Sequence, residues 1–461
     1  MLINIIFIMQ VLRNMYLVYE TSRAKQMFCV IKYSVCHFHE RYFSSKHSVE
    51  LLPEVQTLLD SGDMKHRKHP GVRKSPPLQL PANLVHAVYR LVSNENEKRV
   101  LHEAAELKSL LASRRLPMEE DEVNYRLERV LGPNIDEMTK EKLSKAKRNI
   151  RCEFARWKPI EYNYFQSLAY LAGRLPANYA SIYKVFSEVK SRLPLFQPRS
   201  FFDFGSGVGS AIWASRAVWE QSLNEYFCVD SSSSMNDIAQ DLLIDENTGK
   251  SSIKNIFFRQ FLPASDNIKY DLVVSAFSLL DLPTVEDRVR TIDTLWRKTN
   301  DILVIIENGN LAGFYSVLDA RDYVLQIENQ LPDVGLNRNG AHVILPCPHE
   351  FSCPLMKEEK KKPCGFYVPY EDIFPRHRAV IKKDWISYVV LKKGSRPTDS
   401  NTWPRIVQPV LKKSRFVICR ACCSDGNLKE LIITKAKHGR HAYRCARSSS
   451  LGDLLPLNIE Q

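Results

Sequence analysis

The sequence predicts an α/β fold with a parallel sheet, a helical region before it and a cysteine-rich, basic extension after it. Two observations support this prediction. From Ser200 onward, short apolar runs alternate with helical stretches, which is the pattern of a parallel α/β sheet. The chain also has 461 residues, 44% of them hydrophobic. Because one domain usually holds about 100–200 residues, we expect two or three packed units.

The first 48 residues resemble a targeting segment. Residues 2–12 form an apolar run that is too short to span a bilayer as a helix. Between Arg13 and Lys46, six basic residues face only Glu20 and Glu40. A basic, serine-containing stretch with few acids is typical of a mitochondrial presequence. We therefore expect residues 1–48 to be a mitochondrial transit peptide. A secretory signal and a mis-assigned start codon are the alternatives.

Residues 49–195 are predicted to form a helical N-terminal domain. Apolar residues recur there at helical spacing, and Pro176 is expected to separate the last two helices. These helices carry no catalytic pattern, so core packing is their expected role. The apolar repeats lie in Val85–Val92, Leu101–Leu111, Tyr164–Leu171 and Tyr179–Phe186.

Residues 196–334 are predicted to form a Rossmann-like domain with five short strands. Residues 335–395 are expected to be a cysteine-rich insertion that completes the sheet. Residues 396–461 form a basic extension with twelve Lys or Arg and five Asp or Glu. The five strands are expected at Ser200–Phe204, Tyr226–Val229, Asn255–Phe258, Asp271–Ser275 and Asp301–Ile306.

A glycine-rich loop follows the first strand and indicates a nucleotide-type cofactor. Glycines let the backbone turn sharply and approach a ligand closely, and the next helix offers free N–H groups. Asp230 ends the second strand, where a carboxylate can accept both ribose hydroxyls of an adenosine. The G-x-G-x-G spacing, preceded by Asp203, favours S-adenosylmethionine over NAD. The alternative is a turn that binds nothing. The expected cofactor-binding residues are Asp203, Gly205, Gly207, Gly209 and Asp230.

No catalytic residue is predicted. Methyltransferases that act on base nitrogens carry a polar-Pro-Pro-aromatic turn after the fourth strand, and those that act on pyrimidine C5 carry a cysteine nucleophile nearby. The stretch Tyr270–Pro283 has neither, and Glu307–Asn310 after the fifth strand offers no obvious catalyst. Asp281 is expected to be a capping or surface carboxylate rather than a base. The sequence therefore favours a binder over an enzyme.

The cysteines indicate a metal centre in a reducing compartment. Seven of the eleven follow residue 346. Cys347, Cys353 and Cys364 form C-x5-C-x10-C in a loop-rich segment, and Cys419–Cys423 supplies further thiols. Thiolates on turns beside Pro and Gly are a common way to bind metal, and both zinc and iron–sulfur clusters accept four cysteines. The lack of C-x-x-C pairs tips the balance slightly towards iron–sulfur. Free buried thiols are the alternative.

The net charge of +13 and the pI near 9.1 favour a polyanionic partner, for which nucleic acid is the default candidate. Near the C-terminus, basic residues interleave with Tyr443, which suits phosphate contacts and base stacking. For the net charge, the alternatives are a solvated basic surface and residual presequence charge. For the C-terminal stretch, the alternative is a solvated charged strand pair. The candidate RNA-binding residues are Lys435, Lys437, Arg440, Arg444 and Arg447.

Three separated stretches resemble a known family. They are Arg192–Ala214 with the glycine loop, Cys347-Pro348-His349 with Cys353-Pro354, and Tyr443–Arg447 with Gly452–Pro456. Over roughly residues 80–457 the chain is similar to the methyltransferase-like protein 17 family, which is associated with the mitochondrial small ribosomal subunit.

This resemblance implies an assembly factor in the mitochondrial matrix. It would bind the maturing small subunit and its rRNA alongside other assembly factors, without a membrane. It also implies a class I S-adenosylmethionine-dependent methyltransferase fold that is catalytically silent, a pseudo-methyltransferase. A [4Fe–4S] cluster would be held by Cys347, Cys353, Cys364 and one thiol of the Cys419–Cys423 group, for which we choose Cys419. An active S-adenosylmethionine-dependent rRNA methyltransferase is the alternative, and an NAD-dependent dehydrogenase is a weaker third.

Overall fold

The computed structural model describes residues 48–460, except 132–138, 151–156, 158, 246–247, 264, 266, 330–339, 375–380 and 399. The expected transit peptide lies outside the described residues, apart from Ser48. Within the described part of the chain, every helix is too short or too polar to cross a membrane.

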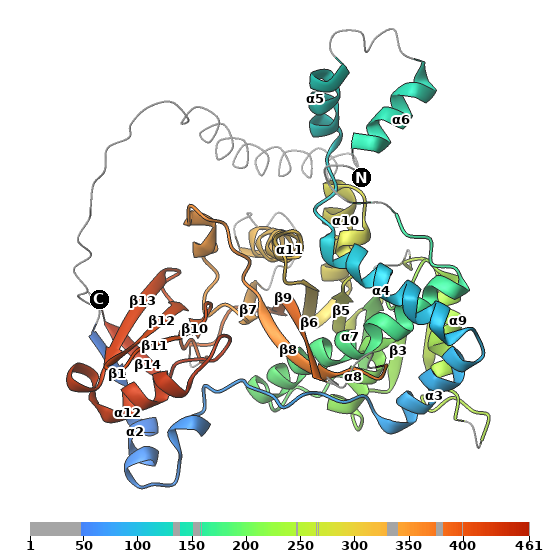
Figure 1. The fold of residues 1–461 in the computed structure, drawn as a ribbon. Helices are drawn as coiled ribbons and strands as arrows, with labels where there is room; N and C mark the ends of the chain where they lie inside the picture. Colours follow the sequence, from blue (N-terminus) through green and yellow to red (C-terminus); the bar gives the residue numbers. More distant parts are fainter. Residues whose placement is uncertain are drawn as a thin grey trace. The chain divides into compact units, whose positions relative to one another are not determined.

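The central sheet has eight strands, and five of them are parallel (Figure 1). Its order is β4-β3-β2-β5-β6-β9-β7, with β8 also paired to β9. The antiparallel strand β9 lies between β6 and β7. The parallel strands are β2 (Ser200–Phe204), β3 (Glu225–Val229), β4 (Ile256–Arg259), β5 (Tyr270–Ala276) and β6 (Thr299–Asn308). The others are β7 (Ala341–Leu345), β8 (Phe366–Glu371) and β9 (Ile381–Lys393).

The five predicted strands are confirmed, with ends within about two residues of those expected. The central strands β5 and β6 are apolar along most of their length because helices cover both faces of the sheet. One face packs against α7 (Tyr164–Arg192), α8 (Ser210–Trp219) and α9 (Ser233–Leu243). The other packs against α10 (Val285–Lys298) and α11 (Leu311–Asn329), which lie on the opposite side of the sheet from α8 in Figure 1.

Between Ala82 and Arg192, the described residues form five helices, the last of which is α7. The structure corrects one expectation, since Pro176 does not separate two helices but lies inside α7. Leu175, Ala177 and Ala180 around it are fully buried, so packing against the core holds the helix together although proline removes one backbone donor. The other helices are α3 (Ala82–Ser93), α4 (Glu97–Ser113), α5 (Glu120–Leu131) and α6 (Lys140–Ile150).

Helices α5 and α6 pack on each other around a small core of their own. Its buried members are Met118, Val123, Leu127, Ile150 and Trp157.

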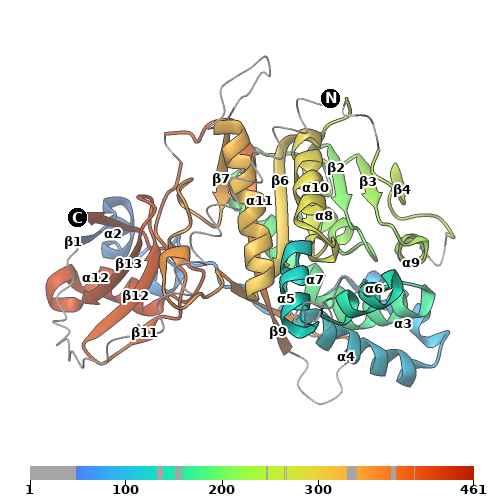
Figure 2. The ribbon, with the colours of Figure 1, turned by 90° about the horizontal axis from the view of Figure 1, so that it is seen from above.

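The last part of the chain forms a second, smaller unit, which lies beside the β7 edge of the sheet (Figure 2). Strands β10 (Arg405–Ile406), β11 (Leu411–Lys412), β12 (Phe416–Cys422) and β13 (Leu428–Thr434) form an antiparallel sheet that packs on α12 (Lys435–Ser448). The region 435–448 is helical, so the strand-pair alternative for these basic residues is wrong.

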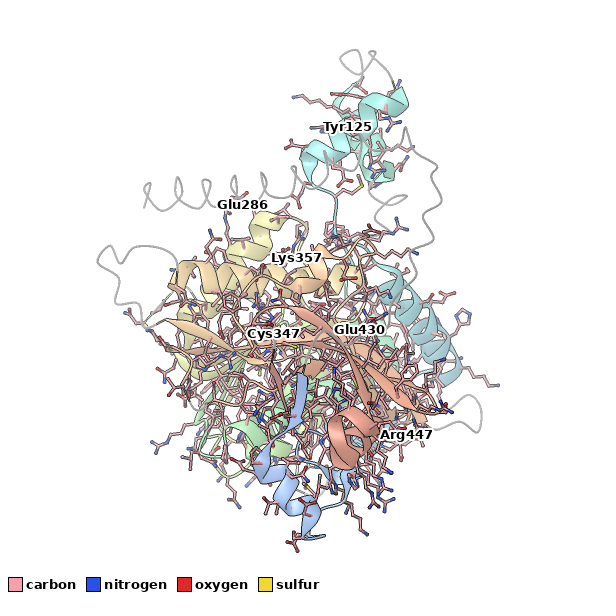
Figure 3. The ribbon with its side chains drawn as sticks, turned by 90° about the vertical axis from the view of Figure 1, so that its left-hand side faces the viewer. Tyr125, Glu286, Cys347, Lys357, Glu430 and Arg447 are labelled. Carbon is pink, nitrogen blue, oxygen red and sulfur yellow. The ribbon has the colours of Figure 1, made fainter. Side chains whose placement is uncertain are left out.

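The C-terminal unit also includes the first described residues. Strand β1 (Ser48–Leu51) pairs antiparallel with β14 (Leu457–Glu460), and α2 (Pro53–Asp60) and the short 3-10 helix η1 (His66–Lys68) follow it. The predicted boundary at residue 49 assigned this stretch to the helical domain. The structure instead buries Val49 in the C-terminal core, because an apolar strand edge was available there. In Figure 3, α12, on which Arg447 lies, is next to the blue segment that carries α2.

Candidate functional site

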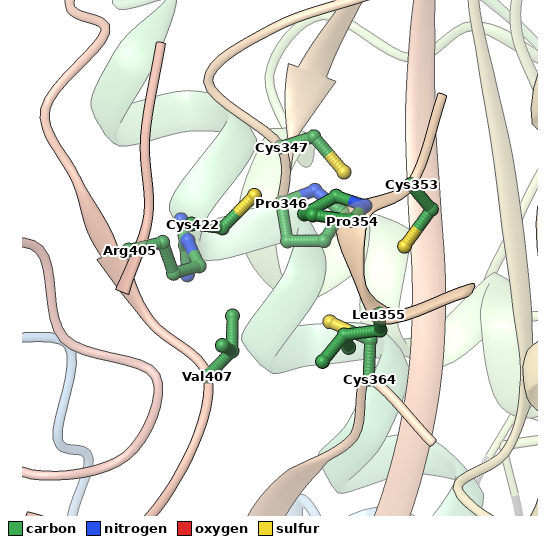
Figure 4. Close-up of a pocket in the computed structure, with 9 residues that line it drawn as sticks. All are labelled: Pro346, Cys347, Cys353, Pro354, Leu355, Cys364, Arg405, Val407 and Cys422. Atoms are coloured by element: carbon green, nitrogen blue, oxygen red, sulfur yellow. The ribbon is translucent and has the colours of Figure 1, made fainter. Parts of the chain in front are cut away.

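Four cysteines line one cavity at the junction of the central sheet and the C-terminal unit (Figure 4). The empty space at this cavity, part of it open to solvent, amounts to about 300 Å³. The four cysteine side chains are directed towards this common space. Its lining residues are Pro346, Cys347, Cys353, Pro354, Leu355, Cys364, Arg405, Val407 and Cys422.

Strand ends and short turns position these thiols. Cys347 comes two residues after β7, and Cys364 comes two residues before β8. Cys353 precedes a 3-10 turn in which its carbonyl accepts from the N–H of Met356 at 3.1 Å. Cys422 is the last residue of β12. The cavity therefore brings together three thiols from the edge of the Rossmann sheet and one thiol from the C-terminal sheet.

Burial raises the pKa of all four thiols, that of Cys353 to about 12. The guanidinium of Arg321 opposes this effect at Cys347. The guanidinium of Arg405 does the same at Cys364. Two buried cations therefore stand where the negative charge of metal-bound thiolates would need compensation.

The structure brings Cys422, and not Cys419, to the other three cysteines. After burial, the charges of Cys347, Cys364 and Cys353 are the main influences that raise the pKa of Cys422. Cys419 is fully buried in the C-terminal core, and beyond burial only Lys412 influences its pKa.

Strand alternation explains this difference. Side chains two residues apart share one face of a strand, so Val417, Cys419 and Ala421 face the core of the C-terminal unit. Cys422 lies on the opposite face of β12, where His349 Nε2 is 3.2 Å from its sulfur. The alternation of β12 is a signal in the sequence that could have identified Cys422. The third thiol of this group, Cys423, is not among the residues that line the cavity.

Among the described residues, no group of three or more His, Cys, Asp or Glu side chains is arranged to hold a metal ion. Four thiolates around one zinc, with Zn–S bonds of about 2.3 Å, would lie roughly 4 Å from one another. The four cysteines surround the cavity without closing on one such point.

The glycine loop after β2 has the conformation that the sequence predicts. Gly205, Gly207 and Gly209 all have positive φ, which L side chains rarely adopt. A Cβ on Gly205 would lie 2.1 Å from Ser278 Oγ. Gly209 begins α8 as its N-cap. Only glycine fits this turn, which brings the loop next to the segment after β5.

The two expected carboxylates lie at the ends of β2 and β3, next to this loop. Asp230 accepts from the N–H groups of Gly207 at 2.8 Å and Ser232 at 2.9 Å. Asp203 is buried, and its Oδ2 has no hydrogen-bond partner. Burial, and then the charge of Asp230, raise the pKa of Asp203 to about 8. The residues thus provide a glycine cradle and a buried carboxyl group with one unused oxygen.

The segment after β5, where a methyltransferase would place its catalyst, is held by contacts within the protein. Phe277 has a φ of 60°, and the guanidinium of Arg174 lies 5.2 Å from the centre of its ring. Ser278 Oγ donates to the Phe204 carbonyl at 3.1 Å. Asp281 pairs with the buried Arg114, so it has the partner of a structural carboxylate.

The candidate RNA-binding residues all lie on α12, and all are exposed. Gly439 has a φ of 79° and a ψ of 166°, so it kinks the helix between Lys437 and Arg440. Arg447 Nη1 donates to the Lys413 carbonyl at 2.7 Å. The helix therefore presents a row of cations outside the cavity of the cysteines.

In the central sheet, the antiparallel strand β9 lies between β6 and β7, and a glycine-rich loop follows β2. This strand order and this loop define a class I S-adenosylmethionine-dependent methyltransferase fold. The family described as "Mitochondrial small ribosomal subunit Rsm22" matches residues 164–456. The chain belongs to this family, whose curated members below are named as mitochondrial proteins.

The human "Ribosome assembly protein METTL17, mitochondrial" is 41% identical over 398 residues, which cover 85% of this chain and 86% of that protein. The "Rsm22-cox11 tandem protein 2, mitochondrial" of Schizosaccharomyces pombe is 30% identical over 331 residues. This match covers 63% of the chain and 43% of the yeast protein, so the chain spans less than half of the length of that relative.

Two of the solved structures that this chain resembles are methyltransferases, both with little sequence identity to it. A putative RNA methyltransferase from Pyrococcus horikoshii is 13% identical, with 46% of this chain and 83% of that chain covered and a TM-score of 0.27. The magnesium protoporphyrin IX methyltransferase from Synechocystis PCC 6803 is 14% identical, with coverages of 52% and 87% and a TM-score of 0.30.

Proposed function

We propose that the protein is an assembly factor of the mitochondrial small ribosomal subunit that binds its rRNA in the matrix, alongside other assembly factors. Membership of the Rsm22 family and the name of the human relative support this role. The exposed cations of α12 supply the contacts to the rRNA backbone.

Within this function, Cys347, Cys353, Cys364 and Cys422 hold a [4Fe–4S] cluster. The observation that carries this proposal is the convergence of four thiols from two units, two of them buried and two partly buried, on one cavity. A four-iron cluster takes one thiolate per iron, so its ligands stand farther apart than those of a single zinc ion. Zinc remains the alternative metal.

When bound, such a cluster supplies covalent cross-links between thiolates. The chain's own residues do the rest. Arg321 and Arg405 offset the charge of the thiolates, and β12 carries Cys422 to the Rossmann sheet. The expected effect is to fix the C-terminal unit, and with it α12, against the rest of the protein.

The glycine loop fits the adenosine end of S-adenosylmethionine. Gly205, Gly207 and Gly209 form the turn, Asp230 would accept from the ribose hydroxyls, and Asp203 would offer the oxygen that has no partner among the described residues. The segment after β5 carries Phe277 and the paired Asp281 instead of a catalytic turn. We therefore place the protein among pseudo-methyltransferases, which use the fold to bind rather than to transfer a methyl group.

The decisive experiment compares anaerobically purified full-length protein with its Cys422→Ser and Cys419→Ser variants. Wild type and Cys419→Ser are expected to be brown, to contain about four iron atoms per chain and to co-sediment with small subunits. Cys422→Ser is expected to lose iron and co-sedimentation together. Colourless wild-type protein with one zinc per chain would show that the site holds zinc and not an iron–sulfur cluster. Iron retained by Cys422→Ser would exclude Cys422 as a ligand.

The intact glycine loop keeps one competing function open, an active rRNA methyltransferase. Purified protein, labelled methyl donor and small-subunit rRNA test it directly. We expect the protein to bind the donor without transfer. Stoichiometric methylation of the rRNA would establish the enzyme and refute the pseudo-methyltransferase.

A further inference from the structure

A second cavity lies between η1 and the end of α12, away from the cysteines. It holds about 570 Å³ of space between side chains and is open to solvent. No apolar side chain and no carboxylate lines it. Its lining residues are Lys65, His66, Arg67, Arg444, Arg447 and Ser448. Two segments that are almost 380 residues apart in the sequence thus build one cationic pocket.

Specific contacts hold η1 against α12. The rings of His66 and His441 stack with centroids 5.0 Å apart, and His66 Nε2 lies 2.8 Å from His441 Nδ1. His441 Nε2 lies 3.0 Å from a carboxylate oxygen of Asp60. Three residues beyond His66, the buried His69 bonds through Nε2 to Ser449 Oγ at 2.9 Å. These contacts fix the two segments against each other, so the pocket is a part of the folded structure.

Three cations of this pocket have no carboxylate partner in the part of the chain that the structure describes. Lys65, Arg67 and Arg444 are exposed, and none of them forms an ion pair with a residue that the structure describes. Arg447 is held in place by the Lys413 carbonyl and lies 3.4 Å from the hydroxyl of Tyr443. Burial, followed by the charges of His441, Arg444 and Arg440, lowers the pKa of His66, which agrees with a positive potential in this pocket.

The chemistry of this pocket matches a phosphodiester. Guanidinium groups bind phosphate oxygens through paired N–H donors, and an ammonium group adds a point charge. The opening to solvent suits a chain that passes through, rather than a small anion that must be enclosed. Stable membrane anchoring usually adds buried apolar side chains to such charges, and the lining contains none among the described residues.

We infer that Lys65, Arg67, Arg444 and Arg447 form a phosphodiester-binding pocket that grips the backbone of RNA. This inference rests on the proposed RNA-binding function. It extends that function from α12 to a segment near the start of the described chain, Lys65–Arg67, which the composition of the C-terminal extension did not indicate. The expected partner is a stretch of single-stranded rRNA backbone.

The test measures binding of full-length protein to a fluorescein-labelled, 20-nucleotide single-stranded RNA of mixed sequence by fluorescence anisotropy. The variant is Lys65→Gln with Arg67→Gln, which leaves His66 and His69 in place. The control is Lys142→Gln with Lys145→Gln, which removes the same charge from the exposed face of α6. The first variant is expected to bind about tenfold more weakly and to reduce the slope of log K against log salt by roughly 1.4, the value for two phosphate contacts. The control should stay within about twofold of wild type, since it changes only the overall charge.

The outcomes separate this pocket from the proposed function. If wild type binds RNA and an Arg440→Gln variant on α12 weakens that binding, while the Lys65/Arg67 variant does not, the pocket is refuted and the function stands. If wild type binds no RNA, both the proposed RNA-binding function and the pocket are refuted. An equal loss in the α6 control would assign the effect to net charge and overturn the pocket. So would binding of wild type to vesicles of anionic phospholipid in preference to RNA.

Discussion

At the scale of single residues, the glycine loop shows how one missing side chain shapes the cofactor site. Gly205 combines a positive φ with the close approach of Ser278. The substitution Gly205→Ala is therefore expected to lower the free energy of unfolding by about 2–4 kcal/mol, because it adds a steric conflict to the cost of the left-handed conformation. Chemical denaturation of the purified variant measures this loss.

Gly249→Ala is the matched control for that experiment. Gly249 has a φ of 62°, yet a Cβ there would meet no atom within 4 Å. It therefore isolates the conformational cost, which is about 1–2 kcal/mol for a residue in the left-handed region. Equal losses in the two variants would mean that the contact with Ser278 contributes nothing.

A second prediction at this scale concerns His69, which is 1% exposed. Burial, helped by the charges of Arg73 and His66, lowers its pKa from 6.5 to about 4. Between these two pH values the unfolded chain binds a proton that the folded protein does not, so stability is lost as the pH falls from about 6.5 to 4. The total loss is about 3 kcal/mol.

Denaturation curves between pH 7 and 4 compare wild type with His69→Gln. Glutamine does not titrate, so the stability of the variant should fall less steeply over this range, by about 3 kcal/mol in total. Parallel curves for the two proteins would show that His69 is not held in its neutral form.

At the scale of elements, periodic apolar runs predicted the strands of the central sheet. Features that depend on contacts with distant parts of the chain could not be predicted in this way. The strands β2 to β6 are apolar runs, and the central ones, β2, β5 and β6, are largely buried, so their positions follow from local pattern. Pro176 appeared to end a helix, but buried neighbours carry α7 through it. The choice between Cys419 and Cys422 depended on which face of β12 turns to the C-terminal core. That choice is visible only once β12 is recognised as a strand.

The hairpin of α5 and α6 yields a prediction at this scale. Its core is separate from the main one, and Trp157 links it to the segment after β5 by donating from Nε1 to the Leu280 carbonyl at 2.7 Å. Leu127→Ala is expected to destabilise the hairpin by about 2–4 kcal/mol. Amide hydrogen exchange should speed up in α5 and α6 and stay unchanged in the central sheet.

Tyr125→Ala on the same helix provides the comparison. Its side chain is 51% exposed, so its loss should leave exchange nearly unchanged. Faster exchange throughout the central sheet in Leu127→Ala would contradict an independent hairpin core.

At the scale of the whole molecule, a buried ionic cluster joins α7 to the C-terminal unit. Glu188 on α7 pairs with Arg405, and it lies 3.6 Å from Arg192 and 3.5 Å from Arg73. Burial alone would raise the pKa of Glu188, but the charges of these arginines lower it to about 2. Since Arg405 also lines the cysteine cavity, the cluster connects the helical layer with the proposed metal centre.

Removal of this carboxylate charge should weaken the joint between the two units. Glu188→Gln leaves the buried Arg405 without its anion, and we expect a loss of about 3–5 kcal/mol in unfolding free energy. Glu220→Gln is the control, because Glu220 is 69% exposed and its ion pair with Arg216 is worth less than about 1 kcal/mol. Similar melting temperatures for the two variants would show that the cluster does not stabilise the joint.

The pairing of β1 with β14 has a consequence for biosynthesis. Residues about 400 positions apart must meet before the two-stranded sheet of β1 and β14 can form, and contacts of such long range form late because closing so large a loop costs entropy. During synthesis or import, before β14 is available, the apolar side of β1 is therefore exposed and has no strand to pair with. We expect this strand to be the place where a chaperone holds the unfinished polypeptide.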